Sequence, residues 1–256
     1  MVGSKYNISH NACLKLYKNG YTSLTVSDYQ IYNEAGFERS DVFEKPVSDK
    51  TSDEKSDRDR FDNIRRSVQK VFDIGMMNDF KYFVTWTLDG SKISRYDPIE
   101  VSKKVKIFLR NMVNRHNLTY VILPEYHKDG GIHMHGLIKG DIKLVENERG
   151  LRMPDGRMIY NMPQWKYGFS TCIEIDNGPE FVSKYITKYV VKDNKKIFGN
   201  FYYAGGKDLV REPKKIVFDM PYNMINSKEY VVEGIGIGFK YVSNCSPELL
   251  KKYIEV

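Results

Sequence analysis

The chain has 256 residues, of which 41 % are hydrophobic and 29 % charged, a balance typical of one sizeable globular domain with additions or of two small domains. No run approaches the roughly 18 apolar residues of a membrane span, and residues 1–20 lack the apolar core of a signal peptide. The net charge of +7 favours a polyanionic partner, and 19 tyrosines and 13 phenylalanines are more than a core of this size needs. We therefore expect no membrane association.

The three cysteines, Cys13, Cys172 and Cys245, are odd in number and far apart. Their spacing fits neither a zinc site nor a disulfide framework. Such sparse cysteine usage favours a reducing compartment, so we expect a protein of the cytoplasm.

The chain divides by composition into three parts. Residues 1–45 hold short mixed segments, with a strand predicted over 21–26, and apolar residues nearly vanish from Pro46 to Arg60. We expect residues 1–56 to be an N-terminal extension with a polar linker, and residues 57–210 to form the main domain. The last part, residues 211–256, is expected to supply strands and a short helix that complete or decorate it.

From Asp57 the pattern becomes helical, with one apolar stripe and many basic residues. The stripe holds Phe61, Ile64, Val68, Val71 and Phe72, and the bases are Arg58, Arg60, Arg65, Arg66 and Lys70. Two interpretations of the bases stay open. They form either a solvated helix face or a surface that faces DNA, in which case Arg65 and Arg66 would bind the strand.

A strand is predicted over 82–88, where residues alternate between two faces. Thr85 and Thr87 share one face with Phe83, and the other face is apolar. Asp97 and Pro98 then start a helix predicted over 99–115, whose inward residues are Val101, Val105, Phe108, Leu109 and Met112. A hairpin is expected over 119–139, and residues 140–164 read as irregular.

Two histidines stand one residue apart in the predicted hairpin. His133 and His135 would point to the same face of a strand, which is how a sheet can hold a divalent cation. Glu125, near the end of the partner strand, could add a carboxylate, and this donor set suits Mg²⁺ or Mn²⁺ as a Lewis acid. The competing interpretation is that the histidines merely alternate on a half-exposed strand. His127 competes with Glu125 as third ligand.

A strand over 169–175 is followed by a helix that starts within 176–180 and carries two tyrosines. Val182, Ile186 and Val190 form its core stripe, while Tyr185, Lys188, Tyr189 and Lys192 fall on a wetter face. Tyrosines one turn apart beside a lysine make a possible nucleophile pair, with Lys188 supplying charge. The alternative is an amphipathic helix whose tyrosines lean on the sheet edge.

The last third carries no nucleotide-binding motif. Gly205, Gly206 and Lys207 fail as a phosphate loop because Gly199 is out of register and Asp208 replaces the Ser or Thr. Further strands are predicted over 214–218 and 230–241, with a short helix opening at Ser246.

The order of the motifs resembles the three-motif signature of HUH endonucleases, the family of rolling-circle replication initiators. A strand with Thr85-Trp86-Thr87 comes first, then His133-Met134-His135, then Tyr185-Ile186-Thr187-Lys188-Tyr189. The second tyrosine resembles the arrangement in replication A proteins of small icosahedral single-stranded DNA phages. The stretch from Arg58 to Leu88 resembles the helix and first strand of initiators from phages and plasmids of Gram-positive bacteria.

The resemblance, which covers residues 57–210, implies an α+β fold. A central antiparallel sheet of about five strands, of the HUH or RRM-like nuclease type, would carry helices mainly on one face. It also implies that a tyrosine nicks and rejoins single-stranded or hairpin origin DNA through a 5′-phosphotyrosine link, with a host helicase and replication machinery as partners in a bacterial cell.

The residues carried over by the resemblance have distinct roles. Metal ligands are His133 and His135, with Glu125 less secure; the first nucleophile is Tyr185, the second Tyr189, and Lys188 assists by its charge. We add Lys184 and Lys192 on the same helix as DNA-binding residues.

Other functions remain open at this point. A transposase or plasmid relaxase would use the same site, and a catalytically silent DNA-binding protein could keep the fold. A zinc hydrolase or deaminase is set aside because the chain lacks the Cys-x-x-Cys that such deaminases need.

Overall fold

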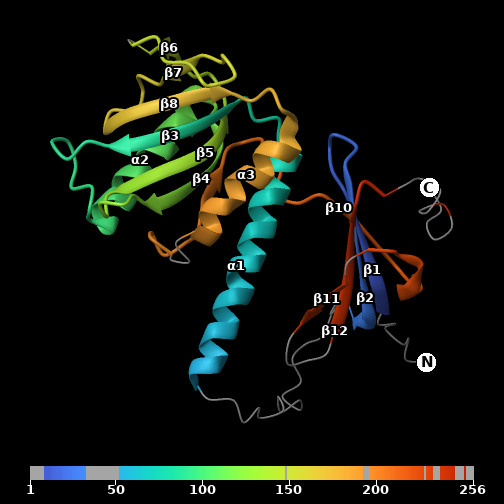
Figure 1. The fold of residues 1–256 in the computed structure, drawn as a ribbon. Coiled ribbons are helices and arrows are strands. Elements are labelled where there is room, and N and C mark those ends of the chain that lie inside the picture. Colours follow the sequence, from blue (N-terminus) through green and yellow to red (C-terminus); the bar gives the residue numbers. More distant parts are fainter. Residues whose placement is uncertain are drawn as a thin grey trace, which may run out of the picture. The chain divides into compact units, whose positions relative to one another are not determined.

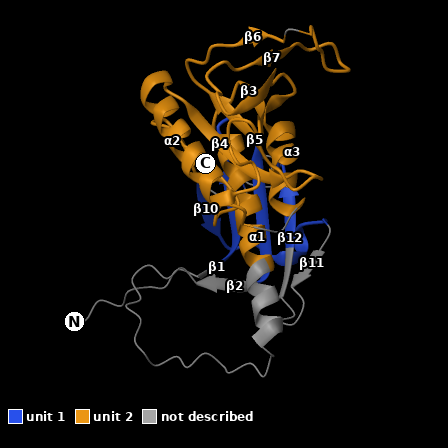
Figure 2. Ribbon diagram, turned by 90° about the vertical axis from the view of Figure 1, so that its left-hand side faces the viewer, with its two compact units in different colours: residues 1–51, 213–256 blue, residues 52–212 orange. Residues whose placement is uncertain are grey.

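A computed structural model describes residues 9–32, 52–147, 149–192, 196–227, 229–232, 237–245 and 251. The chain divides into two compact units, one formed by residues 1–51 and 213–256 and the other by residues 52–212 (Figure 2). Each unit has an antiparallel sheet of its own, with five strands in the first and seven in the second. The α+β class predicted from the sequence is confirmed, but the main sheet has more strands than the expected five.

The first unit joins segments from the two ends of the sequence. Its elements are β1 (Ser9–Leu16), β2 (Thr22–Tyr32), β10 (Lys214–Phe218), a 3₁₀ turn η1 (Tyr222–Met224), β11 (Glu229–Val232) and β12 (Ile237–Ser243). The strand order is β10-β1-β2-β12-β11. The extension and the C-terminal segment, which the sequence analysis treated separately, therefore pair with each other. The helix expected at Ser246 lies outside the described residues.

The second unit holds three α-helices and the seven-stranded sheet. Its elements are α1 (Ser52–Met77), β3 (Tyr82–Leu88), α2 (Pro98–His116), β4 (Thr119–Tyr126), β5 (Ile132–Lys139), β6 (Val145–Glu146), β7 (Ile159–Asn161), β8 (Gly168–Glu174), α3 (Gly178–Lys192) and β9 (Tyr203–Gly205). The strand order is β6-β7-β8-β3-β5-β4-β9, so β3, β5 and β4 lie toward the middle. Within the described residues, no helix combines the length and apolar character needed to cross a bilayer.

Local signals in the sequence account for most boundaries. Asp97 caps α2 by accepting hydrogen bonds from the backbone N–H groups of Ile99 and Glu100, and Pro98 occupies the first turn. Two boundaries differ from expectation. Helix α1 already begins at Ser52, inside the stretch interpreted as a linker, and the region 140–164 carries the short strands β6 and β7 rather than being wholly irregular.

Hydrophobic cores cover both faces of the larger sheet, which corrects the expectation that helices lie mainly on one face (Figure 1). On one face, α2 packs its predicted stripe against Val84, Trp86 and Leu88 of β3. On the other face, α1 and α3 pack together over β4 and β5. The stripe of α3 is buried as predicted, whereas Phe61 of α1 is exposed.

Helices α1 and α3 approach closely where a glycine meets a serine. An added Cβ on Gly75 would stand 2.2 Å from Oγ of Ser183, which is itself fully buried. Because real Cβ atoms essentially never approach a neighbour so closely, the contact needs glycine at position 75. This contact sets the depth at which α3, the helix of the two tyrosines, lies on the sheet.

Substitution of this glycine tests the packing directly. Gly75→Ala should destabilise the protein by about 1–3 kcal/mol through overpacking, although alanine in a helix interior is intrinsically favoured by about 1 kcal/mol. Urea unfolding followed by circular dichroism measures the change. Adding Ser183→Gly should cost less in the Gly75→Ala background than in the wild type. A stabilised Gly75→Ala variant would contradict the contact.

Candidate functional site

Strand β5 presents both histidines on the face of the sheet that carries α1 and α3. His133 pairs across the sheet with Thr87 of β3 and Glu125 of β4, and His135 pairs with Thr85. The β4–β5 turn is closed by the His127 N–H, which donates to the Gly131 carbonyl at 2.8 Å, and Gly130 takes the positive φ of +82° that the turn requires. The hairpin therefore lies where the sequence predicts it.

His135 is held on three sides. Its Nε2 lies 2.8 Å from Oε2 of Glu125, and its Nδ1 lies 3.1 Å from Oγ1 of Thr85. Its ring stacks on that of Tyr189, with centroids 3.9 Å apart and planes at 10°. Since both ring nitrogens and one ring face are engaged, the orientation of this imidazole is fixed by β3, β4 and α3 together.

Both imidazoles favour the neutral form. Burial lowers the pKa of His135 to about 4, although the neighbouring carboxylate of Glu125 opposes this effect. Burial also lowers the pKa of His133, and the proximity of His127 adds to it. A neutral imidazole keeps a lone pair on one nitrogen, which is the form that binds metal ions.

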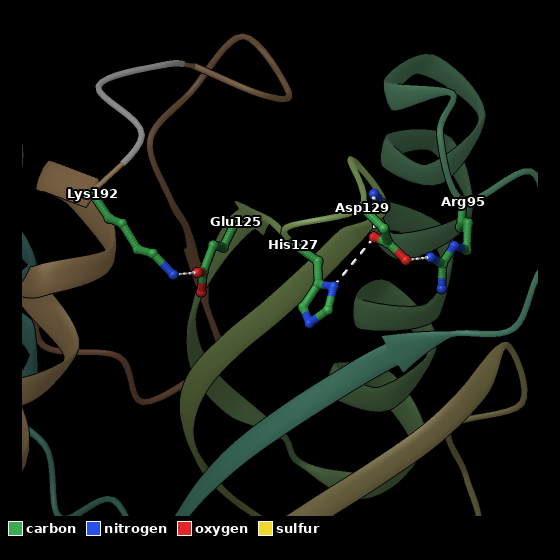
Figure 3. A network of polar contacts seen from close by, with 6 residues as sticks. Arg95, Glu125, His127, Asp129 and Lys192 are labelled. Atoms are coloured by element: carbon green, nitrogen blue, oxygen red, sulfur yellow. Dashed lines mark hydrogen bonds and ion pairs between the residues drawn. The ribbon is translucent and has the colours of Figure 1, made fainter.

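A second polar network surrounds His133 at the open end of the hairpin (Figure 3). The rings of His127 and His133 stack with centroids 4.6 Å apart. Nδ1 of His127 donates to Asp129 at 3.2 Å, and Asp129 also pairs with Arg95. Among the residues that the structure describes, no three His, Cys, Asp or Glu side chains are gathered closely enough to hold a metal ion. The donors stand on one face, but as two pairs.

The two tyrosines of α3 differ sharply in exposure. Tyr185 is 41 % exposed, while Tyr189 is 9 % exposed, which corrects its predicted place on a wetter face. The Tyr189 hydroxyl lies 3.5 Å from that of Tyr185, and the ring of Tyr185 packs edge-on against Phe83. Nζ of Lys188 lies 3.5 Å from the ring centroid of Tyr185 and 4.8 Å from that of Tyr189.

These surroundings move the two hydroxyls in opposite directions. For Tyr185, desolvation acts to raise the pKa, but hydrogen bonds from Lys188 and Tyr189 and the charge of Lys188 outweigh it, so the pKa is lowered. For Tyr189, burial raises the pKa, and its hydrogen bond with Tyr185 raises it further. Tyr185 is therefore the hydroxyl that ionises more readily.

The remaining predicted residues lie in different places. The ammonium of Lys192 contacts Oε1 of Glu125, which brings the end of α3 to the histidine site (Figure 3). Lys184 pairs with Glu180 at 2.6 Å on the exposed side of the same helix. Arg65 and Arg66 are exposed on α1.

A cavity of about 350 Å³ opens beside Tyr185. Its floor is formed by Phe83 and Ile173 of the sheet, and Phe181, 60 % exposed, stands at its side. Its rim is polar, and there Arg157 pairs with Asp155 and Asp176 at 2.6 and 2.8 Å. An exposed aromatic ring beside an apolar floor suits an unpaired base.

Sequence reasoning left three contributors without a role at the site. Phe83 was placed only on the same face as Thr85, and Thr85 itself was not considered to touch a histidine. Pairing β3 with β5 by alternation would have found both, because Thr85 lies opposite His135. Arg157 comes from the region read as irregular, which carries no motif.

Comparison with known proteins bears on the same region. Residues 81–194, from β3 to just past α3, match a family model of replication-associated proteins, the ORF2 type. The match supports a replication-associated protein of the initiator type. Neither the curated proteins nor the solved structures include a significant match to the chain.

The lysine on α3 can be tested separately from any reaction. Lys188→Met should raise the pKa of Tyr185, because the hydrogen bond and the positive charge that favour the phenolate are removed. The measurement is a pH titration by NMR with ¹³Cζ-labelled tyrosine, in which Tyr185→Phe identifies the signal. Lys184→Met is the matched control and should leave the titration unchanged. An unaltered Tyr185 titration in Lys188→Met would refute this account.

Proposed function

We propose that the protein is a metal-dependent nicking and rejoining endonuclease that initiates rolling-circle replication through a covalent 5′-phosphotyrosine. The observation that carries the proposal is the placement of Tyr185 and Lys188 next to Tyr189, which stacks on the buried His135. The match to a replication-associated family over the same residues supports it.

The proposed first step uses Tyr185 as the nucleophile. Its hydroxyl loses a proton to solvent, and the phenolate oxygen attacks the phosphorus of a phosphodiester. A Tyr–O–P bond forms while the bond from phosphorus to the 3′-oxygen breaks, and that oxygen takes up a proton to become a 3′-hydroxyl. Lys188 favours the phenolate and lies close enough to offset charge on the phosphate. The new hydroxyl primes synthesis, and the link conserves the bond for rejoining.

Tyr189 suits the second transfer. It is buried and holds its proton more firmly, so it would act after Tyr185 has been consumed by the first link. Because the two hydroxyls are 3.5 Å apart, a phosphate held at one lies within reach of the other.

The donor set fits a divalent cation in chemical type. His133 and His135 are neutral imidazoles on one face, and Glu125 is a carboxylate only 5 % exposed that lies against His135. We propose that these three residues hold Mg²⁺ or Mn²⁺. When bound, the cation would supply Lewis-acid polarisation of the scissile phosphate. Thr85, on the other nitrogen of His135, would then orient the ring.

The substrate proposed is single-stranded or hairpin origin DNA in a bacterial host, where a helicase and polymerase would act after the nick. The cavity beside Tyr185 offers Phe181 and an apolar floor to an unpaired base next to the scissile phosphate. Mapping the nick to a replication origin, rather than to a transposon end or a transfer origin, separates an initiator from a transposase or relaxase.

The tyrosines are tested by covalent capture. Wild-type protein incubated with Mn²⁺ and single-stranded origin DNA should form an adduct that survives denaturing gel electrophoresis. Tyr185→Phe should abolish the first adduct. Tyr189→Phe should slow it by roughly 2- to 10-fold, because one hydrogen bond of about 0.5–1.5 kcal/mol is lost.

Two results would contradict this assignment. One is the absence of any adduct with the wild type, and the other is an adduct from the Tyr185→Phe/Tyr189→Phe variant. A chain that binds DNA tightly but never forms an adduct would instead be a silent DNA-binding protein.

The metal ligands are tested by Mn²⁺ binding, measured by electron paramagnetic resonance. Loss of even an outer partner of a metal site costs about 10- to 100-fold in affinity, so Glu125→Ala and His135→Ala should each cost at least that. EDTA should also stop adduct formation. His127→Ala is the comparison variant and should bind Mn²⁺ nearly as the wild type does; a greater loss for His127→Ala than for Glu125→Ala would exchange their assignments.

A further inference from the structure

A second concave surface lies on the same unit, away from the tyrosines. It is a groove of about 520 Å³ between α1 and the segment after α3. Its described lining residues are Asn63, Arg66, Ser67, Lys70, Lys196, Asn200, Phe201, Tyr202, Tyr203, Ala204 and Arg211. We call this surface the α1 groove.

The α1 groove is strongly basic. Four of its lining residues, Arg66, Lys70, Lys196 and Arg211, are exposed cations, and none of its described lining residues is Asp or Glu. At neutral pH a groove lined in this way attracts an anionic ligand.

Its neutral residues narrow the class of ligand. Apart from Phe201 and Ala204, they are Asn, Ser and Tyr, the side chains that, with Arg and Lys, donate hydrogen bonds to nucleic-acid phosphates. One cation is held in place, because Nη2 of Arg211 donates to the Ala204 carbonyl at 3.0 Å. A positioned guanidinium loses less conformational freedom when it binds a phosphate.

The groove belongs to the same face of the unit as the tyrosines. Phe201, on its floor, packs in one hydrophobic cluster with Tyr189 and Val190 of α3 and Ile64 of α1. A strand lying in the groove is therefore bound to the same rigid layer that carries the nucleophiles.

We propose that the α1 groove binds the sugar–phosphate backbone of single-stranded DNA, at a site separate from the reacting phosphate. This inference rests on the proposed function for its substrate class and deepens it. The groove anchors a segment of the strand outside the tyrosine site, so it contributes affinity without taking part in the chemistry. An acidic protein segment is the competing ligand of the same charge.

The test compares two variants with equal loss of charge. In Arg66→Gln/Lys70→Gln, affinity for fluorescein-labelled oligothymidylate should fall roughly tenfold, and the slope of log K against log salt should shrink by about 1.4, or 0.7 for each lost phosphate contact. The control is Lys103→Gln/Lys104→Gln, two exposed lysines of α2 outside the groove, which should keep the wild-type slope. Fluorescence anisotropy measures both, and circular dichroism verifies folding.

Adduct formation on a short origin oligonucleotide at saturating concentration separates this inference from the proposed function. The groove variant should form the adduct at the wild-type yield. Equal slopes for the groove variant and the control would overturn the groove whether or not the adduct forms. Lack of adduct in the wild type, with a reduced slope in the groove variant, would overturn only the nicking. Polyglutamate that binds as tightly as oligothymidylate and is lost in the same variant would assign the groove to an acidic protein and overturn the proposal.

Discussion

The stacking of Tyr189 on His135 joins the two elements on which the site depends. One ring comes from the middle of a sheet and the other from a helix that crosses it, and their planes differ by only 10°. The contact requires α3 to lie at one depth on β5, which the close approach of Gly75 to Ser183 allows. The interhelical packing and the catalytic geometry are therefore one constraint, because a shift of α3 would separate both tyrosines from the histidine strand.

The same constraint explains how a carboxylate can be buried here. Glu125 is only 5 % exposed, and a buried charge is costly unless it is paired. Its two oxygens are shared between Nε2 of His135 and the ammonium of Lys192, at the end of α3. A divalent cation would compete with Lys192 for this carboxylate, so the proposed metal ligand is already held in an electropositive environment.

Sequence reasoning predicted the elements near the site well because their signals are local. Alternation identified β3, and an Asp–Pro cap identified the start of α2. The failures involve long-range pairing. Nothing local in the polar stretch around Ser52 indicates that it begins a helix, and nothing in residues 211–256 indicates that their strands pair with β1 and β2. The residues of the α1 groove also come from three separate segments.

The unequal roles of the two tyrosines arise from position rather than residue type. Four residues advance a helix by about 400°, so Tyr189 is turned by about 40° relative to Tyr185 and lies one turn further along. That turn places Tyr189 over His135, while Tyr185 stays at the edge of Phe83 and open to solvent. Burial then holds the proton on one hydroxyl, and Lys188 draws it from the other. A single helix thus gives two identical side chains an order of reaction, because only one of them can become a phenolate readily before the other has reacted.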